Sequence, residues 1–367
     1  MQGSVVRRRR WIRYLACATV CFLVVFALLA EVGLRFMVWN SRRAGLLHAP
    51  DMPDLQKIMP FDPDLIWASP PNLHDFRVET MFDGNVNTAA PRAFTVSTNS
   101  HGLRGAELAA KGTRKRILAV GDSTTFGLGV NDEEAWPAQL EQLLNARGPE
   151  PQYEVLNAGV TGYTAFQCLQ YLLTRGFDLA PDLLVVTSGN NACDTFRPVS
   201  DPEEVANIRK LDPLRWGSLG YQVLQITRAA RRADLSSEPK VRLRLDDYAD
   251  ILARIHKEAH GRGIPVMYVL WPWESQFAAE TGSGQAQHPA AAYQHVLRRT
   301  CSSLGIPLVD LEARWRGGSI SFYLDNVHVD SAGCQDVAQA VATVLQSMLP
   351  NPPVPEAPSP RAVQPDT

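Results

Sequence analysis

Three polar residues of the sequence have the types and spacing of a serine nucleophile with its base. Ser123 follows an apolar run that ends in Gly-Asp, and Asp325 lies three positions before His328. Acyl transfer by serine needs a hydroxyl, a base in contact with it, a group that orients the base, and donors for the oxyanion. A carboxylate three residues before a histidine on one loop can reach Nδ1 of the imidazole, which leaves Nε2 free to face the serine. Ser123, Asp325 and His328 are therefore candidate catalytic residues.

Two further loops carry groups that could donate hydrogen bonds to an oxyanion. The stretch 157–163 contains glycines, among them Gly162, which leave backbone N–H groups accessible, and a second loop contains the amides Asn190 and Asn191. Each loop follows an apolar run that predicts a strand, as Ser123 does. Open α/β sheets bind their ligands at the carboxyl ends of the strands. We therefore expect these segments to meet at one edge of a sheet.

The elements that must position these residues are predicted by an alternation of strand-like and helical segments that begins near residue 115. Short runs rich in Val, Ile and Leu predict strands at Arg116–Val120, Tyr153–Asn157, Leu183–Thr187, Pro265–Leu270 and Pro307–Leu311. Helical patterns lie between and after them at Glu133–Ala146, Thr164–Arg175, Leu243–Arg262, Ala290–Leu304 and Ser331–Met348. This alternation predicts an α/β fold, a three-layer, flavodoxin-like domain with a parallel sheet of about five strands covered on both faces.

The remaining segments differ in composition from this domain. We expect a basic stub and membrane helix at 1–40, an irregular lead-in with β structure at 41–112, and the catalytic domain at 113–349. Residues 195–239 interrupt this alternation and predict an insertion or cap that faces the substrate. The proline-rich segment 350–367 predicts a disordered tail.

The N-terminus has the pattern of a membrane signal-anchor. Arg7 to Arg10 and Arg13 precede an uncharged apolar run from Tyr14 to Ala30, which is near the about 20 residues that a bilayer span requires. Leu28 occupies a position where cleavage after Ala30 would require a small residue, so an uncleaved anchor is expected, with a cleaved signal peptide as the alternative. Because the arginines lie on the N-terminal side of this run, they predict a cytoplasmic N-terminus, a single pass through the cytoplasmic membrane and a catalytic domain on the periplasmic side.

The bulk composition excludes several classes of function. A formal net charge of −2 gives no basis for binding nucleic acid. The eight histidines are scattered and the six cysteines form no Cys-x-x-Cys pair, so neither a metal site nor a cofactor is expected. Four cysteines lie in the predicted exported part, and they could form disulfides or remain buried thiols: Cys168, Cys193, Cys301 and Cys334.

Taken together, these motifs resemble a known family. Gly121-Asp122-Ser123, Gly162, Asn191 and Asp325-x-x-His328 occur in this order and resemble the four blocks of the SGNH (GDSL-like) hydrolase superfamily, over roughly residues 116–349. The N-terminal part of the chain is similar to that of membrane-anchored bacterial members. The resemblance implies Ser123 as nucleophile, His328 as general base oriented by Asp325, and Asp122 as a structural member of the turn. It also implies an oxyanion hole formed by the N–H groups of Ser123 and Gly162 and the amide of Asn191.

Two features leave alternatives open at the site. The third block of the family usually reads Gly-x-Asn-Asp, and Ala192 here replaces the last residue, so Asn190 is an alternative to Asn191 as the oxyanion donor. Trp271-Pro272-Trp273 follows the fourth predicted strand, where it could form a wall against a sugar or acyl group or belong to the core.

The expected function is that of a serine esterase acting through an acyl-enzyme. Its substrate would be an ester of an envelope polysaccharide or a lipid, and its membrane contact would be the N-terminal helix. Two alternatives remain open. The same residues could transfer an acyl group to or from an envelope glycan, or the chain could be a catalytically silent binding module of the envelope.

Overall fold

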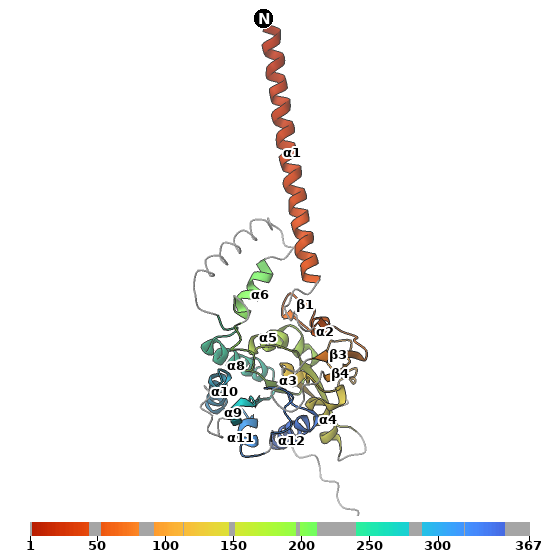
Figure 1. Cartoon of the computed structure of the whole chain (residues 1–367), viewed down its shortest axis with the longest axis vertical. Helices are drawn as coiled ribbons and strands as arrows, with labels where there is room; N and C mark the ends of the chain where they lie inside the picture. The colour runs from red at the N-terminus through yellow and green to blue at the C-terminus, as the bar shows by residue number, and fades with distance from the viewer. Residues whose placement is uncertain are drawn as a thin grey trace, which may run out of the picture.

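A long N-terminal helix and an α/β domain make up the described part of the chain (Figure 1). The computed structural model describes residues 2–43, 53–80, 92–112, 114–146, 151–195, 199–210, 240–278, 288–318 and 320–348. Most of the predicted insertion at 195–239 and all of the predicted tail at 350–367 lie outside these residues.

The domain is built on a five-stranded sheet in the order β6-β5-β7-β8-β9, in which every pair is parallel. Its strands are β5 (Lys115–Gly121), β6 (Tyr153–Gly159), β7 (Leu183–Thr187), β8 (Val266–Leu270) and β9 (Leu308–Asp310). Each lies on a strand predicted from the sequence. The α/β fold class and the parallel sheet of five strands are thus confirmed.

Helices cover both faces of this sheet because successive strand residues point to opposite faces. Leu118 and Val120 of β5 pack in one core with α5 (Ala165–Tyr171), α8 (Leu245–His260) and α10 (Ala290–Leu304). Ile117 and Ala119 pack in a second core with α4 (Trp136–Asn145), α11 (Leu311–Trp315) and α12 (Ser331–Met348). Full burial of an aliphatic side chain contributes about 1.5–3 kcal/mol. Two separate apolar cores therefore hold β5 from both faces of the sheet.

The strand order creates a switch point at the carboxyl end of β5. The chain passes from β5 to β6 on one side and then returns to β7 on the other. The connection after β5 therefore runs to one side of the sheet, and the connection after its neighbour β7 runs to the other side. Open α/β sheets bind ligands in the crevice that results between two such strands. Ser123, two residues beyond the end of β5, lies at this point.

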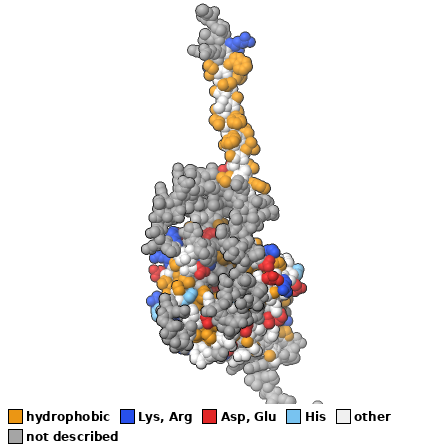
Figure 2. All heavy atoms as spheres, in the orientation of Figure 1, with side chains coloured by type: hydrophobic (Ala, Val, Ile, Leu, Met, Phe, Trp, Pro, Cys, Tyr) orange, Lys and Arg blue, Asp and Glu red, His pale blue; other side chains and the backbone are white. Residues whose placement is uncertain are grey.

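Helix α1 (Gln2–Arg43) carries the apolar run of the N-terminus. Its window Arg10–Phe36 is 27 residues long, apolar enough to cross a membrane, and none of it is buried. Figure 2 shows hydrophobic side chains along the whole of this stretch, with basic side chains near its N-terminal end. At 1.5 Å per residue the window is longer than the roughly 30 Å hydrocarbon core of a bilayer. By length and composition, this helix is a candidate membrane span.

The lead-in forms two small hairpins beside the domain. Its elements are α2 (Pro53–Lys57), β1 (Phe61–Asp62), β2 (Ile66–Trp67), β3 (Phe76–Thr80) and β4 (Arg92–Val96). Strand β1 pairs with β2 and β3 pairs with β4, both antiparallel. A third core joins Val78 and Phe94 of this region to Phe126, a residue of the helix that begins at Ser123. The lead-in therefore packs against the helix at whose start the candidate nucleophile lies.

Arg104 ties the lead-in to the loop that follows this helix. Its side chain is 1% exposed, and its guanidinium pairs with Asp132 at 2.7 Å. The same group donates hydrogen bonds to four carbonyl oxygens, which belong to Thr95, Phe126, Gly127 and Val130. A buried charge is tolerated only where all its donors have hydrogen-bond acceptors. Here most of the acceptors are backbone carbonyls, one in β4 and three in the segment 126–130.

Replacement of Arg104 by methionine is expected to lower the free energy of unfolding by about 3–5 kcal/mol, because it leaves a carboxylate and four carbonyls without their donor. The measurement is urea unfolding of the full chain in detergent, followed by near-ultraviolet circular dichroism.

The matched control is Arg77→Met, which removes an ion pair with Glu79 whose side chains are 71% and 61% exposed. Its loss should cost less than about 1 kcal/mol. Equal effects of the two substitutions would contradict a structural role for the buried guanidinium.

Three predicted helices differ from the observed ones at their ends, and one of them, predicted at Leu243–Arg262, is observed as Leu245–His260. The helix predicted from Glu133 begins as a 3-10 turn, Asp132–Glu134, and α4 starts only at Trp136 with a proline in its first turn, where proline is favoured. The helix predicted to reach Arg175 ends as α5 at Tyr171 and continues as a π-helical turn, Leu172–Gly176, and a 3-10 turn, Phe177–Leu179. Two shorter helices complete the fold: α6 (Asp201–Lys210) and α9 (Ser275–Ala278).

Candidate active site

The turn after β5 presents Ser123 at the start of the short helix α3 (Ser123–Phe126). Asp122 caps this helix, and its Oδ1 accepts hydrogen bonds from the backbone N and Oγ1 of Thr124 at 2.9 and 2.6 Å. As the first residue of the helix, Ser123 has an N–H with no intrahelical acceptor. A Cβ at Gly121 would overlap the side chain of Thr125, and one at Gly159 would overlap the backbone of Phe126. Glycine at both strand ends thus allows the turn to lie close against the sheet.

The three candidate catalytic residues form one hydrogen-bonded chain. The distance between Ser123 Oγ and His328 Nε2 is 2.7 Å, although the two residues are 205 positions apart. His328 Nδ1 lies 2.6 Å from Asp325 Oδ2. Oδ1 of the same carboxylate accepts the N–H groups of Val327 at 2.7 Å and His328 at 2.6 Å. The structure therefore brings together the residues that the spacing predicted, with each imidazole nitrogen facing its expected partner.

Asp325 is held in its ionised form. Burial by itself would raise the pKa of this carboxyl, but the charge of His328 and hydrogen bonds from His328 and Val327 outweigh it and hold the pKa below its usual value. An ionised Asp325 keeps the proton of the imidazole on Nδ1 and leaves a lone pair on Nε2.

The loop that carries His328 is fixed by the carboxyl end of β8. Trp271 Nε1 donates to the carbonyl of Val327 at 2.8 Å, and Tyr323 Oη donates to the carbonyl of Pro272 at 2.9 Å. Trp271 is 1% exposed and belongs to a core. It is thus a core residue that supports the histidine loop, whereas Trp273 is half-buried and stacks on His288 with ring centres 3.9 Å apart.

The structure gives different partners to Asn190 and Asn191, the two amides that the sequence left as alternative oxyanion donors. Asn190 Nδ2 donates to Asp122 Oδ2 at 3.1 Å and is buried beneath the turn. Asn191 Nδ2 donates to the carbonyl of Tyr163 at 3.0 Å, which places this side chain beside the neighbouring Gly162. Asn190 therefore braces the nucleophile turn, and Asn191 lies against the loop of the other candidate donor.

Asp122 is fully buried. Burial raises the pKa of its carboxyl, against the hydrogen bonds from Thr124 and Asn190 that lower it. One of its oxygens accepts from Thr124 in the turn and the other from Asn190 in the loop after β7. These contacts match the structural role that the family resemblance implied.

Sequence reasoning missed a buried arginine near the loop of Gly162. Arg242 is 1% exposed and binds Asp201 through two hydrogen bonds of 3.0 and 2.9 Å. Its Nη2 also donates to Gln167 at 2.8 Å, and Asp201 accepts from Thr164 Oγ1 at 2.7 Å. Arg242 lies just after the predicted insertion without a motif around it, so nothing in the local pattern distinguishes it from a surface arginine.

Asp194 follows the Asn191 loop and lies 3.9 Å from Arg242. Burial raises the pKa of its carboxyl to about 6, although Arg242 opposes the shift. The pKa is thus higher in the folded chain than in the unfolded chain, so ionisation costs stability. This cost is absent below about pH 4, grows between pH 4 and 6, and is complete at neutral pH.

Asp194→Asn is therefore expected to raise the free energy of unfolding at pH 7.5 by about 1 kcal/mol, a value reduced because one third of the side chain is exposed. The gain should vanish at pH 4, where the native carboxyl is protonated. Urea unfolding of both proteins at the two pH values measures it. A loss of stability at pH 7.5 would mean that the attraction to Arg242 exceeds the cost of burial.

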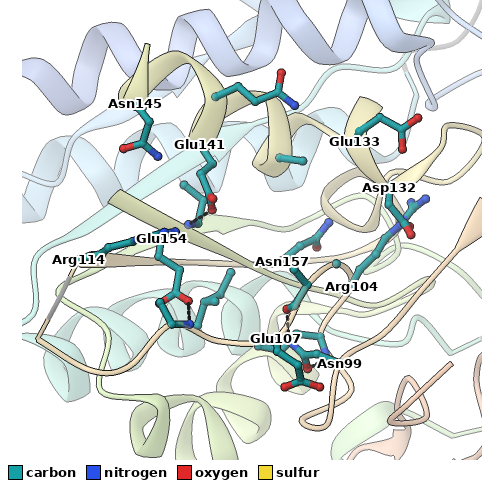
Figure 3. A pocket seen from close by; sticks show the side chains of 18 residues that line it. Asn99, Arg104, Glu107, Arg114, Asp132, Glu133, Glu141, Asn145, Glu154 and Asn157 are labelled. Carbon is teal, nitrogen blue, oxygen red and sulfur yellow. Dashed lines mark hydrogen bonds and ion pairs between the residues drawn. The ribbon is translucent and has the colours of Figure 1, made fainter. Parts of the chain in front are cut away.

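A cavity of about 650 Å³ lies away from Ser123, between α4, the outer edge of β6 and the lead-in (Figure 3). Two of its carboxylates are engaged by the protein: Glu141 accepts the N–H of Val155 at 2.8 Å, and Glu154 pairs with Arg116 at 2.7 Å. The bond from Val155 to Glu141 uses a donor of the edge strand β6 that a further strand could otherwise take, which protects the edge of the sheet. Ser123, Asp325 and His328 do not line this cavity.

The described residues contain no group of three or more His, Cys, Asp or Glu side chains arranged to hold a metal ion. All six cysteines fall within the described ranges, and each is a free thiol. Burial raises the pKa of Cys193 to about 11 and that of Cys301 to about 12. Thiols with raised pKa values are poor nucleophiles at neutral pH, so these two cysteines are not candidate nucleophiles.

An α/β sheet with a serine, a histidine and an aspartate in one hydrogen-bonded chain at its carboxyl edge is the arrangement of serine hydrolases. The chain belongs to the GDSL-like lipase/acylhydrolase family, whose model matches residues 119–335. It is accordingly a hydrolase acting on ester bonds. The SGNH resemblance inferred from the sequence is confirmed.

Several solved structures are similar to the chain. They include a lipase/acylhydrolase from Enterococcus faecalis (17% identity, 64% of this chain and 97% of that one, TM-score 0.45). Others are the acetyl xylan esterase AlAXEase (15%, 63% and 99%, TM-score 0.44) and the α/β hydrolase LAE5 from the metagenome of Lake Arreo, Spain (17%, 66% and 99%, TM-score 0.43). No curated protein matches the chain.

Proposed function

We propose that the chain is a membrane-anchored serine esterase with Ser123 as its nucleophile. Ser123 Oγ attacks the ester carbonyl carbon while its proton passes to His328 Nε2. Asp325 holds the imidazole in the required tautomer and stabilises the imidazolium that forms. The 2.7 Å hydrogen bond between Ser123 and His328 carries this proposal.

The oxyanion of the tetrahedral intermediate is bound by the N–H groups of Ser123 and Gly162 and by the amide of Asn191. Collapse of the intermediate breaks the ester bond, and the proton on His328 goes to the leaving alkoxide. A water then attacks the acyl-enzyme and loses a proton to Nε2. The bond between the acyl carbon and Ser123 Oγ breaks, Oγ takes the proton back from His328, and the carboxylic acid is released. His328 accepts and returns the proton in each of these reaction steps, so the proposed mechanism requires no cofactor.

The substrate class that we propose is an acylated sugar or a lipid of the cell envelope. Helix α1 supports this proposal because it is long and apolar enough to span a membrane. Arg7–Arg10 and Arg13 at its start would remain in the cytoplasm. The catalytic domain would then lie on the periplasmic side, where envelope glycans and lipids are within reach of a tethered enzyme.

Hydrolysis of nitrophenyl esters by the full chain in detergent tests the proposal. Acetyl and long-chain esters are compared, and a fluorophosphonate probe is used to label the nucleophile. We expect hydrolysis of at least one ester together with labelling of Ser123. A preference for acetyl esters would indicate an acylated sugar, and a preference for long chains a lipid. Absence of both hydrolysis and labelling in folded protein would overturn the esterase.

A further inference from the structure

Two residues outside the catalytic motifs hold the peptide groups on either side of Gly162. Trp67 Nε1, from β2 of the lead-in, donates to the carbonyl of Thr161 at 2.8 Å. Arg242 Nη1 donates to the carbonyl of Gly162 itself at 2.7 Å. These carbonyls belong to the peptide groups that precede and follow the Cα of Gly162, so the orientation of both planes is fixed.

The first of these bonds sets the direction of the Gly162 N–H. The chain contains no cis peptide bond among its described residues, and in a trans peptide the C=O and the N–H point in opposite directions. Because Trp67 holds the Thr161 carbonyl on the lead-in side, the Gly162 N–H points away from that side. The second bond fixes the next peptide plane while Gly162 adopts a φ of +77°, in a region that favours glycine.

The two residues also contact each other and the remaining oxyanion candidate. The Arg242 guanidinium lies over the Trp67 ring, 5.3 Å from its centre. Tyr163 Oη donates to the Trp67 carbonyl at 2.8 Å, and the Tyr163 carbonyl accepts from Asn191 Nδ2 at 3.0 Å. A Cβ at Gly162 would lie 3.2 Å from Trp67 Cζ2, so the indole ring is the surface on which this loop rests.

The electrostatics of this arrangement favour a strong donor at Gly162. The Thr161 carbonyl belongs to the same peptide group as the Gly162 N–H, and it accepts a hydrogen bond from Trp67. A hydrogen bond accepted by a peptide carbonyl polarises the peptide and strengthens its N–H as a donor. Asp201 neutralises Arg242 through two hydrogen bonds, so the cation orients the loop without leaving an uncompensated charge.

We infer that Trp67 and Arg242 are positioning residues that orient the Gly162 N–H as an oxyanion donor, an inference that rests on the proposed esterase function. The lead-in is then part of the catalytic apparatus, because one of the two residues lies within it.

Trp67→Phe tests the inference, since it removes the indole N–H and keeps an aromatic ring against Gly162. We expect kcat for ester hydrolysis to fall about tenfold with KM unchanged. This loss is smaller than the about 10²–10³ for removal of a whole oxyanion donor, because the Gly162 N–H remains present but less ordered. The rate of fluorophosphonate labelling should fall in parallel, while its end point, which counts folded sites, should not.

Tyr268→Phe is the matched control. It also keeps an aromatic ring while removing one buried donor to a backbone carbonyl, because Tyr268 is fully buried and its Oη donates to the carbonyl of Leu252 in α8 at 2.9 Å. The control should lose stability as Trp67→Phe does and keep its kcat. An unchanged kcat in Trp67→Phe, a loss confined to KM, or an equal loss of kcat in the control would each overturn the inference.

Two further comparisons keep the outcomes separate. Tyr163→Phe removes the hydrogen bond to the Trp67 carbonyl and should give a smaller loss of kcat in the same direction, and it decides the question if Trp67→Phe does not fold. A native chain without esterase activity would overturn the proposed function itself. If the native chain is active and the kcat of Trp67→Phe and Tyr163→Phe equals that of the native chain, only the positioning role would be overturned.

Discussion

Ser123→Ala is expected to lower kcat for ester hydrolysis by about 10⁶-fold, since the variant loses both the nucleophile and the acceptor of the acyl group. The fold should be unaffected, because Asp122 caps α3 through its own side chain and the Ser123 carbonyl still accepts from Gly127 and Leu128. The measurement is single-turnover and steady-state hydrolysis of nitrophenyl esters by the full chain in detergent.

The loss should not grow when His328 is also removed. Ser123 Oγ and His328 Nε2 share one hydrogen bond, and residues that act as a unit have non-additive effects on kcat. The double variant Ser123→Ala/His328→Ala is therefore expected to retain the same residual rate as either single variant. Ser303→Ala, which removes a hydroxyl bonded to the Thr300 carbonyl in α10, is the control and should have native activity. Retention of a tenth of the native kcat by Ser123→Ala would contradict the mechanism.

The sheet and the histidine loop could be predicted because their signals are local. Strand β7 and helices α10 and α12 have the bounds that the sequence predicted, since an apolar run or a helical pattern is a property of neighbouring residues. The spacing of Asp325 and His328 likewise encodes a contact within one loop. The meeting of Ser123 with His328 followed from the parallel sheet, whose strands all end at one edge.

The supports of the site could not be predicted because their partners are distant in sequence. Trp67 and the Thr161 carbonyl are 94 positions apart, and Arg242 and Asp201 are 41 apart. Trp271 was left between two interpretations because an aromatic residue at a strand end fits a wall and a core equally well. The burial of an arginine or the choice of a carbonyl partner depends on how separate segments pack, and no periodicity records it.

Asp325→Asn is expected to lower kcat by about 10⁴-fold at neutral pH with little change in KM. The amide oxygen can still accept the N–H groups of Val327 and His328, as Asp325 Oδ1 does at 2.7 and 2.6 Å, so the loop should keep its conformation. The amide nitrogen would then face Nδ1 of the imidazole and donate to it. This exchange forces the proton onto Nε2, where it faces Ser123 and removes the lone pair that accepts the hydroxyl proton.

The control for this effect is Asp330→Asn, on the same loop. Asp330 Oδ1 accepts the N–H of Gly333 at 3.0 Å at the start of α12, and asparagine caps a helix about as well as aspartate. Both variants lose one carboxylate, but only Asp325 contacts the imidazole, so only Asp325→Asn should lose kcat. Native kcat in Asp325→Asn would mean that another group sets the tautomer of His328, and it would remove Asp325 from the mechanism while leaving Ser123 and His328 in their roles.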